Sequence, residues 1–359
     1  MSFEIKRKNT RQIRVGQVKI GGGAPIAVQS MTNTRTQDIP ATVAQIKRLE
    51  AAGCEIVRVA VPDAEAAAAI TGIKREITIP LIADIHFDYQ LAIAAARAGA
   101  DGLRINPGNI GNHERIQAVV AAAKDHGIPI RIGVNSGSLE PDLLKKYGGV
   151  TVDGLVESAL RQIELMATLD FTELKLAIKS ANVPQSIDAY RRLSEKTDFP
   201  LHVGITEAGG LYSGIVKSSL GIGMLLAEGI GDTLRVSLTR DPVEEVRVGF
   251  EILKALGLRQ RGPEIISCPT CGRCNIDLFS IAETVENALL TRTTPIKIAI
   301  MGCVVNGPGE AREADVGIAG GDGIGILFKK GEVVKKFPEN QLVDELLRAV
   351  DEFENNVHQ

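Results

Sequence analysis

The chain lacks the features by which many proteins bind nucleic acids or membranes. Its 359 residues include no Trp, four Tyr and nine Phe, which are too few aromatic rings for a base-stacking surface. The formal net charge of −3 provides no basic field for nucleic acid. No apolar run is long enough to span a bilayer, and the basic segment MSFEIKRKNTRQIRVG has no apolar core of a secretory signal. We therefore expect a cytoplasmic protein that binds neither nucleic acid nor membranes.

The five cysteines are distributed unevenly along the sequence. Cys54 stands alone in an apolar context, which is typical of a small buried side chain. The other four lie between Cys268 and Cys303. In a reducing compartment such a cluster argues against a disulfide framework and indicates a metal or redox centre.

Strand-like segments alternate with helical segments through the first two thirds of the chain. Eight apolar segments with polar residues at their ends are 26–32, 55–61, 80–87, 101–108, 128–137, 172–181, 200–209 and 233–239. Most of the intervening segments have the pattern of amphipathic helices. This alternation predicts an α/β fold, a (β/α)8 TIM barrel. An open doubly wound sheet shares the alternation, but polar residues at every strand end favour the barrel.

A second, smaller domain is expected after the barrel. The last barrel helix begins at Asp241, which is followed by a proline suited to a first helical turn. Residues 258–265 have the character of a linker. Beyond them the pattern predicts a helix, a strand, a hairpin and a terminal helix near 340–353. The predicted domains are a barrel over 1–258 and an α+β domain over 264–359.

Arginine recurs in four of the eight predicted strands. The strands read VRVAVP, LRINPG, IRIGVN and LRVSL, and their arginines are Arg58, Arg104, Arg131 and Arg235. Because alternate side chains of a barrel strand point inward, we expect these guanidinium groups in one cavity, together with Lys179. Converging cations repel one another unless an anion joins them. A diphosphate-like substrate at the strands' C-terminal ends meets this requirement, because the guanidinium fork suits phosphate oxygens.

Acids and neutral polar residues lie near the same strand ends. The acids are Asp84 and Glu207, and the residues expected to complete hydrogen bonding to the substrate are Asn106, Asn135, Thr206 and Ser237. For any one arginine, the alternative is a structural ion pair or a charge exposed at the surface. For Glu207, the alternatives are proton transfer and an ion pair with one of the arginines.

Three further features receive no functional assignment. His86 and His202 lie in predicted strands, where a single histidine is more often packed in the core than a ligand. The glycine-rich segment GIAGGDGIG at 317–325 lacks the G-x-G-x-x-G spacing and a following helix. It is therefore rejected as a dinucleotide site.

The spacing of the late cysteines fits an iron–sulfur cluster. SCPTCGRC supplies Cys268, Cys271 and Cys274, and MGCVVNGPGEA supplies Cys303 and Glu310. A zinc site of four cysteines usually takes its second pair from another C-x2-C, whereas the distal cysteine here is a single one in a Gly/Pro-rich turn. Four thiolates would saturate a [4Fe–4S] cluster and give an electron carrier. A catalytic cluster needs one iron with a replaceable ligand.

Several longer motifs resemble one enzyme family. SCPTC, GCVVNGPGEA, ADIHFDY, LRINPGNIG, GITEAGG and EGIGDTLRVSL resemble the 4-hydroxy-3-methylbut-2-enyl diphosphate synthase family of the methylerythritol phosphate pathway, from about Val28 to Gly309 and beyond. The resemblance implies a barrel followed by a cluster domain of sulfite-reductase-like fold. It also implies a substrate, 2-C-methyl-D-erythritol 2,4-cyclodiphosphate, which is the kind of anion that the arginines require.

The resemblance implies that three cysteines and one glutamate hold the [4Fe–4S] cluster: Cys268, Cys271, Cys303 and Glu310. Cys274 is then surplus, and the spacing leaves open that Cys274 replaces Glu310 as a ligand. A carboxylate oxygen is a weaker ligand than a thiolate, so it leaves an exchangeable iron. The expected catalytic residues are Glu310, as this exchangeable ligand, and Glu207, for proton transfer near the departing oxygen.

By resemblance, the protein is an iron–sulfur oxidoreductase of isoprenoid biosynthesis. A two-electron reduction opens the cyclic diphosphate and expels a hydroxyl as water, giving (E)-4-hydroxy-3-methylbut-2-enyl diphosphate. The barrel cations are expected to hold the diphosphate and to stabilise the charge that it carries as the ring opens. The sequence has no nicotinamide or flavin motif, so flavodoxin or ferredoxin is the expected electron donor.

The predicted topology favours a head-to-tail homodimer. The helix over 242–257 runs from the substrate mouth toward the bottom of the barrel, a distance of roughly 25 Å. A linker of about eight residues reaches at most about 30 Å when fully extended. We therefore expect the cluster domain of one chain to cap the barrel of the other, with open and closed states of the dimer.

Two other functions share part of this pattern. Radical enzymes that use S-adenosylmethionine also join a barrel to a three-cysteine cluster, but they usually carry C-x3-C-x2-C early in the chain, and this sequence does not. The other function is a zinc-stabilised interaction module on a degenerate barrel. Metal analysis and a visible spectrum of anaerobically purified protein distinguish these possibilities, because a zinc protein is colourless.

Overall fold

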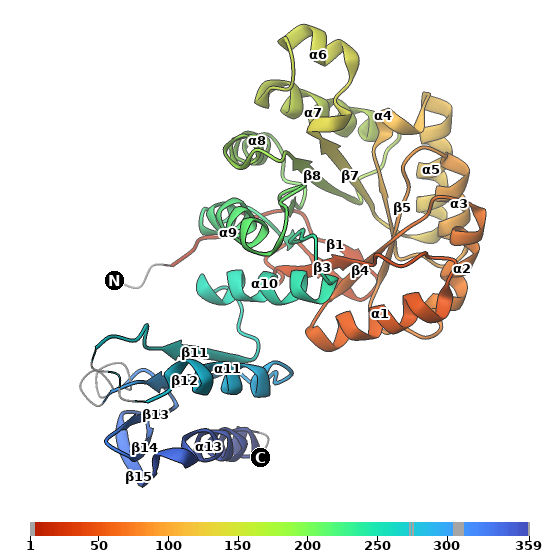
Figure 1. The fold of residues 1–359 in the computed structure, drawn as a ribbon. Helices are drawn as coiled ribbons and strands as arrows, with labels where there is room; N and C mark the ends of the chain where they lie inside the picture. The colour runs from red at the N-terminus through yellow and green to blue at the C-terminus, as the bar shows by residue number, and fades with distance from the viewer. Residues whose placement is uncertain (1–3, 273, 275, 304–311, 358–359) are drawn as a thin grey trace. The chain divides into compact units, whose positions relative to one another are not determined.

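The computed structural model describes residues 4–272, 274, 276–303 and 312–357. The chain forms two compact units, Met1–Arg259 and Gln260–Gln359 (Figure 1). Each unit has its own sheet and its own apolar core. Among the described residues, no helix combines the length and the apolar character needed to cross a bilayer.

Eight parallel strands form a barrel in the first unit. The strands are β3 (Ala27–Met31), β4 (Ile56–Ala60), β5 (Leu81–Asp84), β6 (Gly102–Ile105), β7 (Ile130–Asn135), β8 (Leu174–Lys179), β9 (His202–Val203) and β10 (Thr233–Leu234). Their order in the sheet is β8-β7-β6-β5-β4-β3-β10-β9. A parallel bridge between Leu176 and Leu201 joins the two outer strands. The barrel predicted from the sequence is confirmed, and the open sheet is rejected.

Helices surround the barrel on the outside (Figure 1). They are α1 (Ile39–Ala52), α2 (Ala64–Lys74), α3 (Tyr89–Arg97), α4 (Pro107–Ile110), α5 (His113–His126), the 3₁₀ turn η1 (Ser136–Ser138), α6 (Pro141–Tyr147), α7 (Val152–Thr168), α8 (Val183–Lys196), α9 (Leu211–Ala227) and α10 (Pro242–Ala255). Helices α1 and α5 end at Gly53 and Gly127 in the left-handed region, with φ of 101° and 62°. Glycine adopts this conformation without strain, so the chain turns directly toward the next strand.

Strand alternation explains why arginines occur inside an apolar fold. Val57 and Val59 of β4 belong to the core between the sheet and its helices. Arg58 lies between them and therefore faces the barrel interior. In the same way Leu103 and Ile105 pack outward from β6, and Arg104 faces inward.

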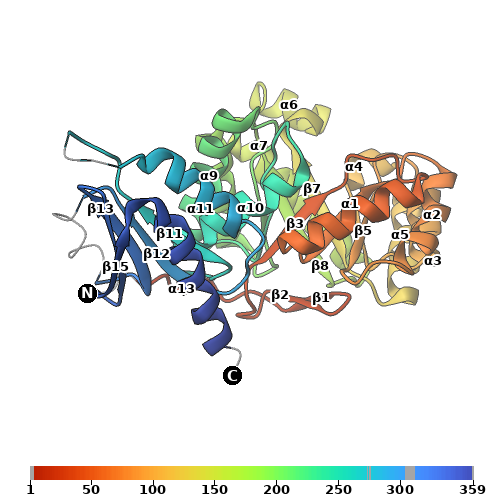
Figure 2. The ribbon, with the colours of Figure 1, turned by 60° about the horizontal axis from the view of Figure 1, so that its bottom comes forward.

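A two-stranded hairpin closes the bottom of the barrel (Figure 2). Strands β1 (Ile13–Val15) and β2 (Val18–Ile20) pair antiparallel. Their apolar side chains form one cluster with Ala27, Ile56 and Ile82, which lie at or near the starts of β3, β4 and β5. The sequence analysis did not predict this hairpin. It leaves the strands' C-terminal ends as the mouth of the barrel.

The second unit contains a five-stranded sheet with helices packed on it. Its strands and helices are β11 (Pro263–Ser267), α11 (Leu278–Leu289), β12 (Ile296–Met301), β13 (Val316–Gly321), β14 (Ile324–Lys329), β15 (Glu332–Pro338), the 3₁₀ turn η2 (Glu339–Gln341) and α13 (Leu342–Val357). Strands β11, β12 and β13 are parallel, and β14 and β15 continue the sheet antiparallel. Apolar residues of α11 and α13 pack against the sheet in one core.

One sequence interpretation needs correction in this unit. The segment 258–265 is not a simple linker, because β11 begins at Pro263 and pairs with β12. The glycine-rich segment 317–325 forms most of β13 and the start of β14. Its glycines allow close packing: a Cβ at Gly317 would lie 2.2 Å from the Phe328 ring. Glycine here serves sheet packing.

The chain leaves the barrel at its bottom. Arg259 Nη1 donates to Ile26 O at 2.7 Å and to Glu55 Oε2 at 2.6 Å. Ile26 and Glu55 directly precede β3 and β4, so both lie at the N-terminal ends of the strands. The guanidinium also lies 5.4 Å from the Phe250 ring centroid on α10. These contacts fix the exit point on the face opposite the mouth.

Candidate active site

Basic side chains converge inside the barrel. They come from five strands or strand ends and are all buried or half-buried: Arg58, Arg104, Arg131, Lys175, Lys179 and Arg235. The register places Arg104 of β6 directly opposite Arg131 of β7 and next to Asp84 of β5. The predicted convergence of the arginines and Lys179 is thus present in the structure. This interior carries a large excess of positive charge.

Asp84 joins two of these arginines. Its carboxylate accepts a hydrogen bond from Arg104 Nη1 at 2.9 Å and lies 3.4 Å from Arg58 Nε. Burial opposes ionisation of Asp84, but the Arg58 charge, the hydrogen bond from His86 and the Arg104 charge hold its pKa well below the usual range. Burial lowers the pKa of Arg58 to about 10, against the opposite effect of Asp84. Asp84 therefore stays ionised and orients both guanidinium groups.

Arg131 has no acidic partner among the described residues. It is 3% exposed, and neither its Nε nor its Nη1 has a hydrogen-bond partner in that part of the chain. Burial, followed by the charges of Arg58 and Arg104, lowers its pKa well below the ordinary value. An unpaired buried cation costs several kcal/mol, so this arrangement is stabilised when an anion enters. Arg131 is the clearest indication of an anionic ligand.

Two glycines make room for cations in the same cavity. A Cβ at Gly133 of β7 would lie 3.1 Å from Arg104 Nε. A Cβ at Gly204, just after β9, would lie 2.7 Å from Lys179 Nζ. Burial, then the charge of Arg131, lowers the pKa of Lys179 well below its ordinary value. Both side chains thus rest against bare backbone, which holds them in the interior.

Arg235 is neutralised from outside the strand layer. Its Nε and Nη2 each donate to Glu245 of α10 at 3.1 Å, in a two-pronged ion pair. Glu245 is 2% exposed and also accepts from Ser30 Oγ and from the Leu238 amide, each at 3.1 Å. The ion-pair alternative therefore describes part of the role of Arg235. Its Nη1 faces Met31 Sδ at 3.9 Å.

The neutral residues of the predicted site lie at the ends of the inward strands. Asn106 follows β6, is 6% exposed and caps α4 by accepting from the Gly108 amide at 3.2 Å. Asn135 is the last residue of β7. When its side-chain amide is oriented so that both the nitrogen and the oxygen have partners, the oxygen accepts a hydrogen bond from Arg104 Nη2 at 3.2 Å. Thr206 and Ser237 are half-buried just beyond β9 and β10. All four positions border the mouth of the barrel.

Glu207 occupies a strained position at that mouth. Its φ is 52°, in the left-handed region that a non-glycine residue seldom adopts. The side chain is exposed, and among the described residues it forms no ion pair with an arginine. The ion-pair alternative is therefore not observed. Strain of this kind often accompanies a functional position.

The two histidines have different environments. His202 is completely buried, and its Nδ1 lies 2.8 Å from Thr233 Oγ1, which confirms the interpretation as a core residue. That interpretation is wrong for His86, because its side chain is 54% exposed just beyond β5. Its Nε2 lies 3.6 Å from Asp84 Oδ2, so it reaches the arginine network from the mouth. Cys54 is buried as expected, and burial raises its pKa to about 12.

The sequence analysis missed Lys175, a further buried cation. Its side chain is 1% exposed, and within the described part of the chain its Nζ has no hydrogen-bond partner. It lines a narrow gap at the barrel bottom together with Arg131 and with Ile13 and Val15 of the hairpin. The signal was present in the sequence, because Lys175 and Lys179 are four residues apart and therefore face the same side of β8.

Replacing Lys175 by methionine should stabilise the protein at neutral pH. Burial, then the charges of Arg131 and Arg58, lowers the pKa of Lys175 from 10.5 to about 7. Between these values the unfolded chain binds more protons than the folded one, so the free energy of unfolding rises with pH through this window. We expect Lys175→Met to add roughly 1–4 kcal/mol near pH 7 and to flatten this slope. Urea unfolding at pH 7 and pH 9 measures both effects; parallel curves for the two proteins would contradict the assignment.

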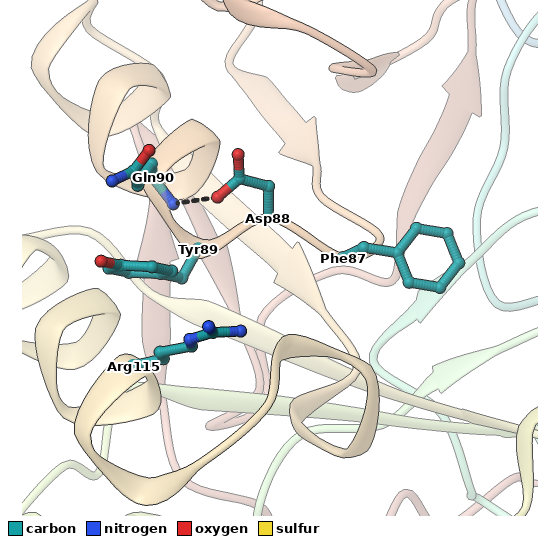
Figure 3. A pocket seen from close by; sticks show the side chains of 5 residues that line it. All are labelled: Phe87, Asp88, Tyr89, Gln90 and Arg115. Atoms are coloured by element: carbon teal, nitrogen blue, oxygen red, sulfur yellow. Dashed lines mark hydrogen bonds between the residues drawn. The ribbon is translucent and has the colours of Figure 1, made fainter.

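A surface cavity of about 420 Å³ lies at the rim of the mouth, lined by Phe87, Asp88, Tyr89, Gln90 and Arg115. In Figure 3 the Tyr89 ring lies over the Arg115 guanidinium, whose Cζ is 5.6 Å from the ring centroid. Phe87 points to the opposite side. Asp88 caps α3 by accepting from the Gln90 amide at 2.9 Å. None of the interior cations lines this cavity, so it is distinct from the anion site.

The late cysteines lie at one end of the sheet in the second unit. Cys268 directly follows β11, and its amide donates to Ile300 O of β12 at 3.1 Å. Cys303 lies two residues beyond the end of β12. Because β11 and β12 are parallel neighbours, their C-terminal ends lie at the same edge. The Cys274 amide donates to Cys271 O at 2.9 Å in the turn that follows Cys268.

This edge fits part of the predicted ligand set. Cys268, Cys274 and Cys303 are half-buried, Cys271 is exposed, and no disulfide joins the five cysteines. A Cβ at Gly302 would lie 2.5 Å from Cys274 Sγ, so Cys274 packs against the strand end that carries Cys303. Within the described residues, no three Cys, His, Asp or Glu side chains are gathered to hold a metal ion. Glu310 lies outside the described residues. The predicted ligand set therefore stays a prediction.

Comparison with known proteins identifies the family. The model of the GcpE TIM-barrel domain matches residues 10–250, and that of the GcpE protein C-terminal domain matches residues 264–352. The chain belongs to the GcpE family. The resemblance found in the motifs is thereby confirmed over both units.

Close relatives span nearly the full length of this GcpE chain. Proteins from Desulfotalea psychrophila, Geobacter sulfurreducens and Caldanaerobacter subterraneus are 60%, 58% and 59% identical to it. The alignments cover 98%, 96% and 96% of this chain and 97%, 98% and 97% of the relatives. All three relatives are named 4-hydroxy-3-methylbut-2-en-1-yl diphosphate synthase (flavodoxin).

Solved structures of low sequence identity share the fold. Dihydropteroate synthase of Yersinia pestis is 14% identical, with a TM-score of 0.50 over 70% of this chain and 100% of that chain. Type I 3-dehydroquinate dehydratase of Clostridium difficile is 15% identical, with a TM-score of 0.50 over 69% of this chain and 100% of that chain. At these identities the likeness concerns the fold alone.

Proposed function

We propose that this chain reduces 2-C-methyl-D-erythritol 2,4-cyclodiphosphate to (E)-4-hydroxy-3-methylbut-2-enyl diphosphate, as an iron–sulfur oxidoreductase of isoprenoid biosynthesis. The observation that carries the proposal is the group of buried cations in the barrel, where Arg131 has no acidic partner among the described residues. A cyclic diphosphate supplies the missing negative charge. Relatives that are 56–60% identical carry the name of this enzyme.

The barrel residues are assigned distinct roles in the reaction. Arg58, Arg104, Arg131 and Lys179 hold the diphosphate, and Asp84 orients the first two. Preorganised cations in a water-poor cavity stabilise the charge that passes to the diphosphate when the ring C–O bond breaks. Overall, two electrons and one proton are consumed, and a hydroxyl leaves as water. We assign this proton to Glu207, which is exposed at the mouth.

The second unit is assigned the electron transfer. Cys268, Cys271, Cys303 and Glu310 are proposed to hold a [4Fe–4S] cluster; the three cysteines lie at or near one edge of the sheet. When bound, such a cluster supplies single electrons and a Lewis-acidic iron. Flavodoxin is the proposed donor, because it appears in the names of the relatives. A reducing cytoplasm suits this thiolate chemistry.

A head-to-tail homodimer is part of the proposal. The chain leaves its own barrel at the bottom, where Arg259 is bound to Ile26 O and Glu55. The cavity with the cations that are proposed to bind the substrate opens at the other end of the barrel. We therefore assign the cluster that serves each mouth to a second copy of the chain, whose barrel is inverted relative to the first.

The test uses two inactive variants in one dimer. Arg104→Ala disables the barrel, and Cys271→Ser disables the cluster. We expect wild-type protein to turn over the cyclodiphosphate with dithionite under anaerobic conditions, and each variant alone to be inactive. Heterodimers obtained by co-expression with two different tags contain one intact site of two, so about half of the wild-type turnover is expected.

The outcomes separate the parts of the proposal. Wild-type protein with iron and sulfide that leaves the cyclodiphosphate unchanged would refute the proposed reaction. Active wild-type protein with an inactive heterodimer would refute the assembly of the site from two chains, and the reaction itself would stand. A colourless zinc protein would favour the interaction module.

A further inference from the structure

Lys175 is a buried basic residue to which the proposed reaction assigns no role. Its side chain is 1% exposed, and its Nζ has no hydrogen-bond partner among the described residues. The narrow gap that it lines together with Arg131 has no room for a water molecule. An ammonium group without partners is costly in such a place, whereas a neutral amine is tolerated. The surroundings of Lys175 therefore favour the neutral amine as long as the barrel holds no anion.

Strand register places Lys175 beside the cations of the anion site. Lys175 of β8 is the direct partner of Arg131 on the neighbouring strand β7, and Arg131 is in turn the partner of Arg104 on β6 (Figure 1). Asp84, the partner of Arg104 on β5, continues this row around the inside of the barrel. The acid stands at one end of the row and Lys175 at the other. The direct neighbour of Lys175 in the row is thus a cation.

Small residues lie above the Arg131–Lys175 pair. The next inward positions toward the mouth are Gly133 on β7 and Ala177 on β8, which are also partners of each other. A Cβ at Gly133 would lie 3.1 Å from Arg104 Nε, so a cation of the anion site occupies this space. No large side chain at these two positions separates the pair from the anion site. The charge of a bound anion therefore acts on Lys175 as well as on Arg131.

The basic and neutral groups around Lys175 supply no negative charge. Burial, followed by the charges of Arg131 and Arg58, lowers the pKa of Lys175 to about 7. His202 of β9 stays neutral, because burial and the surrounding cations lower its pKa well below the ordinary value. Tyr190 of α8 is buried too, and burial raises its pKa. Its hydroxyl donates to His202 O at 2.6 Å, so it remains a neutral phenol.

The acid on this side of the barrel already has other partners. Asp232 raises the pKa of Lys175, against the larger effects of burial and the two arginines. Its carboxylate accepts hydrogen bonds from Thr10 Oγ1 and the Leu201 amide, both at 2.9 Å, and from Arg7 Nη2 at 3.2 Å. None of these bonds involves Lys175. A negative charge that enters the barrel supplies what Lys175 lacks.

We propose that Lys175 is a positioning residue for the diphosphate, whose side chain binds a proton when the anion enters the barrel and keeps it until the product leaves. The inference rests on the proposed function and adds a residue below the cations that hold the substrate. The proton comes from solvent, binds the Nζ lone pair and is not passed to the substrate. The ammonium repels the Arg131 guanidinium toward the mouth. It also adds positive charge where ring opening increases the negative charge of the ligand.

The pH range of this effect follows from linkage. Without ligand, Lys175 is charged below pH 7 and neutral above it. A bound anion raises its pKa, so binding above pH 7 takes up a proton and weakens as the pH rises. The uptake due to Lys175 should be about 0.1 proton at pH 6 and about 0.9 proton at pH 8. A lysine that only supports the fold would give no such dependence.

The experiment is calorimetric titration of the oxidised holoenzyme with the cyclodiphosphate, without a reductant, so that the ligand binds and is not turned over. Buffers with different enthalpies of ionisation give the number of protons taken up; the acidic oxygens of the ligand are ionised throughout pH 6–9 and contribute none. At pH 8, Lys175→Met should take up about 0.9 proton less than the wild type. Its dissociation constant should exceed that of the wild type about 10- to 100-fold at pH 6 and at most about 3-fold at pH 9.

A matched control and a direct measurement accompany the titration. Lys19→Met changes an exposed lysine of the β1–β2 hairpin and should match the wild type at every pH. Lysine labelled with ¹³C at Cε reports the protonation of Lys175 in the wild type, where its resonance is assigned from its absence in Lys175→Met or Lys175→Arg. We expect this resonance to titrate with a pKa of about 7 without ligand and above about 9 in the complex.

The outcomes separate this inference from the proposed reaction. Equal proton uptake by the wild type and Lys175→Met, or a loss of affinity of the same size at every pH, would overturn the role of Lys175. A Lys175 resonance whose midpoint does not move when the ligand binds would do the same. In each case the cyclodiphosphate still binds, and the proposed reaction stands. Wild-type holoenzyme that bound no cyclodiphosphate at any pH would refute the proposed reaction, and this inference with it.

Discussion

Arg131→Met should abolish most of the activity and at the same time stabilise the protein. In the absence of substrate, Arg131 is a buried cation with unpaired Nε and Nη1 beside Arg58 and Arg104. Methionine fills a similar volume without charge, so we expect the free energy of unfolding to rise by roughly 1–4 kcal/mol. The diphosphate loses a desolvated ion pair, and kcat/KM should fall on the order of 10²- to 10⁴-fold. Urea unfolding and steady-state kinetics with dithionite measure the two effects.

Arg235→Met is the matched control for that experiment. Both arginines are inward and largely buried, but Arg235 is held by two hydrogen bonds to Glu245. Its removal leaves Glu245 buried without a counter-charge, which should cost roughly 3–5 kcal/mol of stability. The two variants are therefore expected to shift stability in opposite directions. If Arg131→Met destabilised the protein as much as Arg235→Met, Arg131 would be a structural residue, and the argument for an anionic ligand would lose its main support.

Cys303→Ala should remove the cluster, and Cys274→Ala should leave it in place. Cys303 and Cys268 lie just past the ends of two parallel neighbouring strands, β12 and β11, which is where two ligands from distant parts of the sequence meet. Without the Cys303 thiolate, only two of the three predicted cysteine ligands remain to hold the cluster. We expect turnover to fall at least about 1,000-fold for Cys303→Ala, because the electron route is lost. Iron and sulfide content, the visible spectrum and turnover of anaerobically purified protein are the measurements.

Cys274 provides the contrast within the same turn. Its Sγ donates to Ile276 O at 3.4 Å and packs near Gly302. We expect Cys274→Ala to retain iron, sulfide and most of the turnover. The reverse pattern, in which Cys274→Ala loses the cluster and Glu310→Ala keeps it, would assign the fourth ligand to Cys274. The cluster would then be thiolate-bound at all four irons, and the proposed chemistry at an exchangeable iron would fail.

The sequence was most informative where the position of a residue within one predicted strand was enough to tell which side of the sheet it faces. Arg58, Arg104 and Arg131 were placed correctly inside the barrel, because strand alternation has a period of two and flanking Val, Leu and Ile define the outward face. Local patterns were less reliable at the boundaries. The predicted linker over 258–265 included the first residues of β11, which begins at Pro263. His86 was interpreted as a core residue because the predicted strand over 80–87 included it, whereas β5 ends at Asp84.

The amino-acid sequence by itself determined the eightfold strand–helix alternation, the inward arginines and the clustered cysteines, because each depends on spacing along the chain. The tertiary structure decided which charges meet. It paired Arg235 with Glu245 across 10 positions and left Arg131 and Lys175 without acidic partners among the described residues. It also closed the barrel bottom with the β1–β2 hairpin and left one face of α9 uncovered. Contacts of this kind depend on how separate elements pack in space, and no local pattern encodes them.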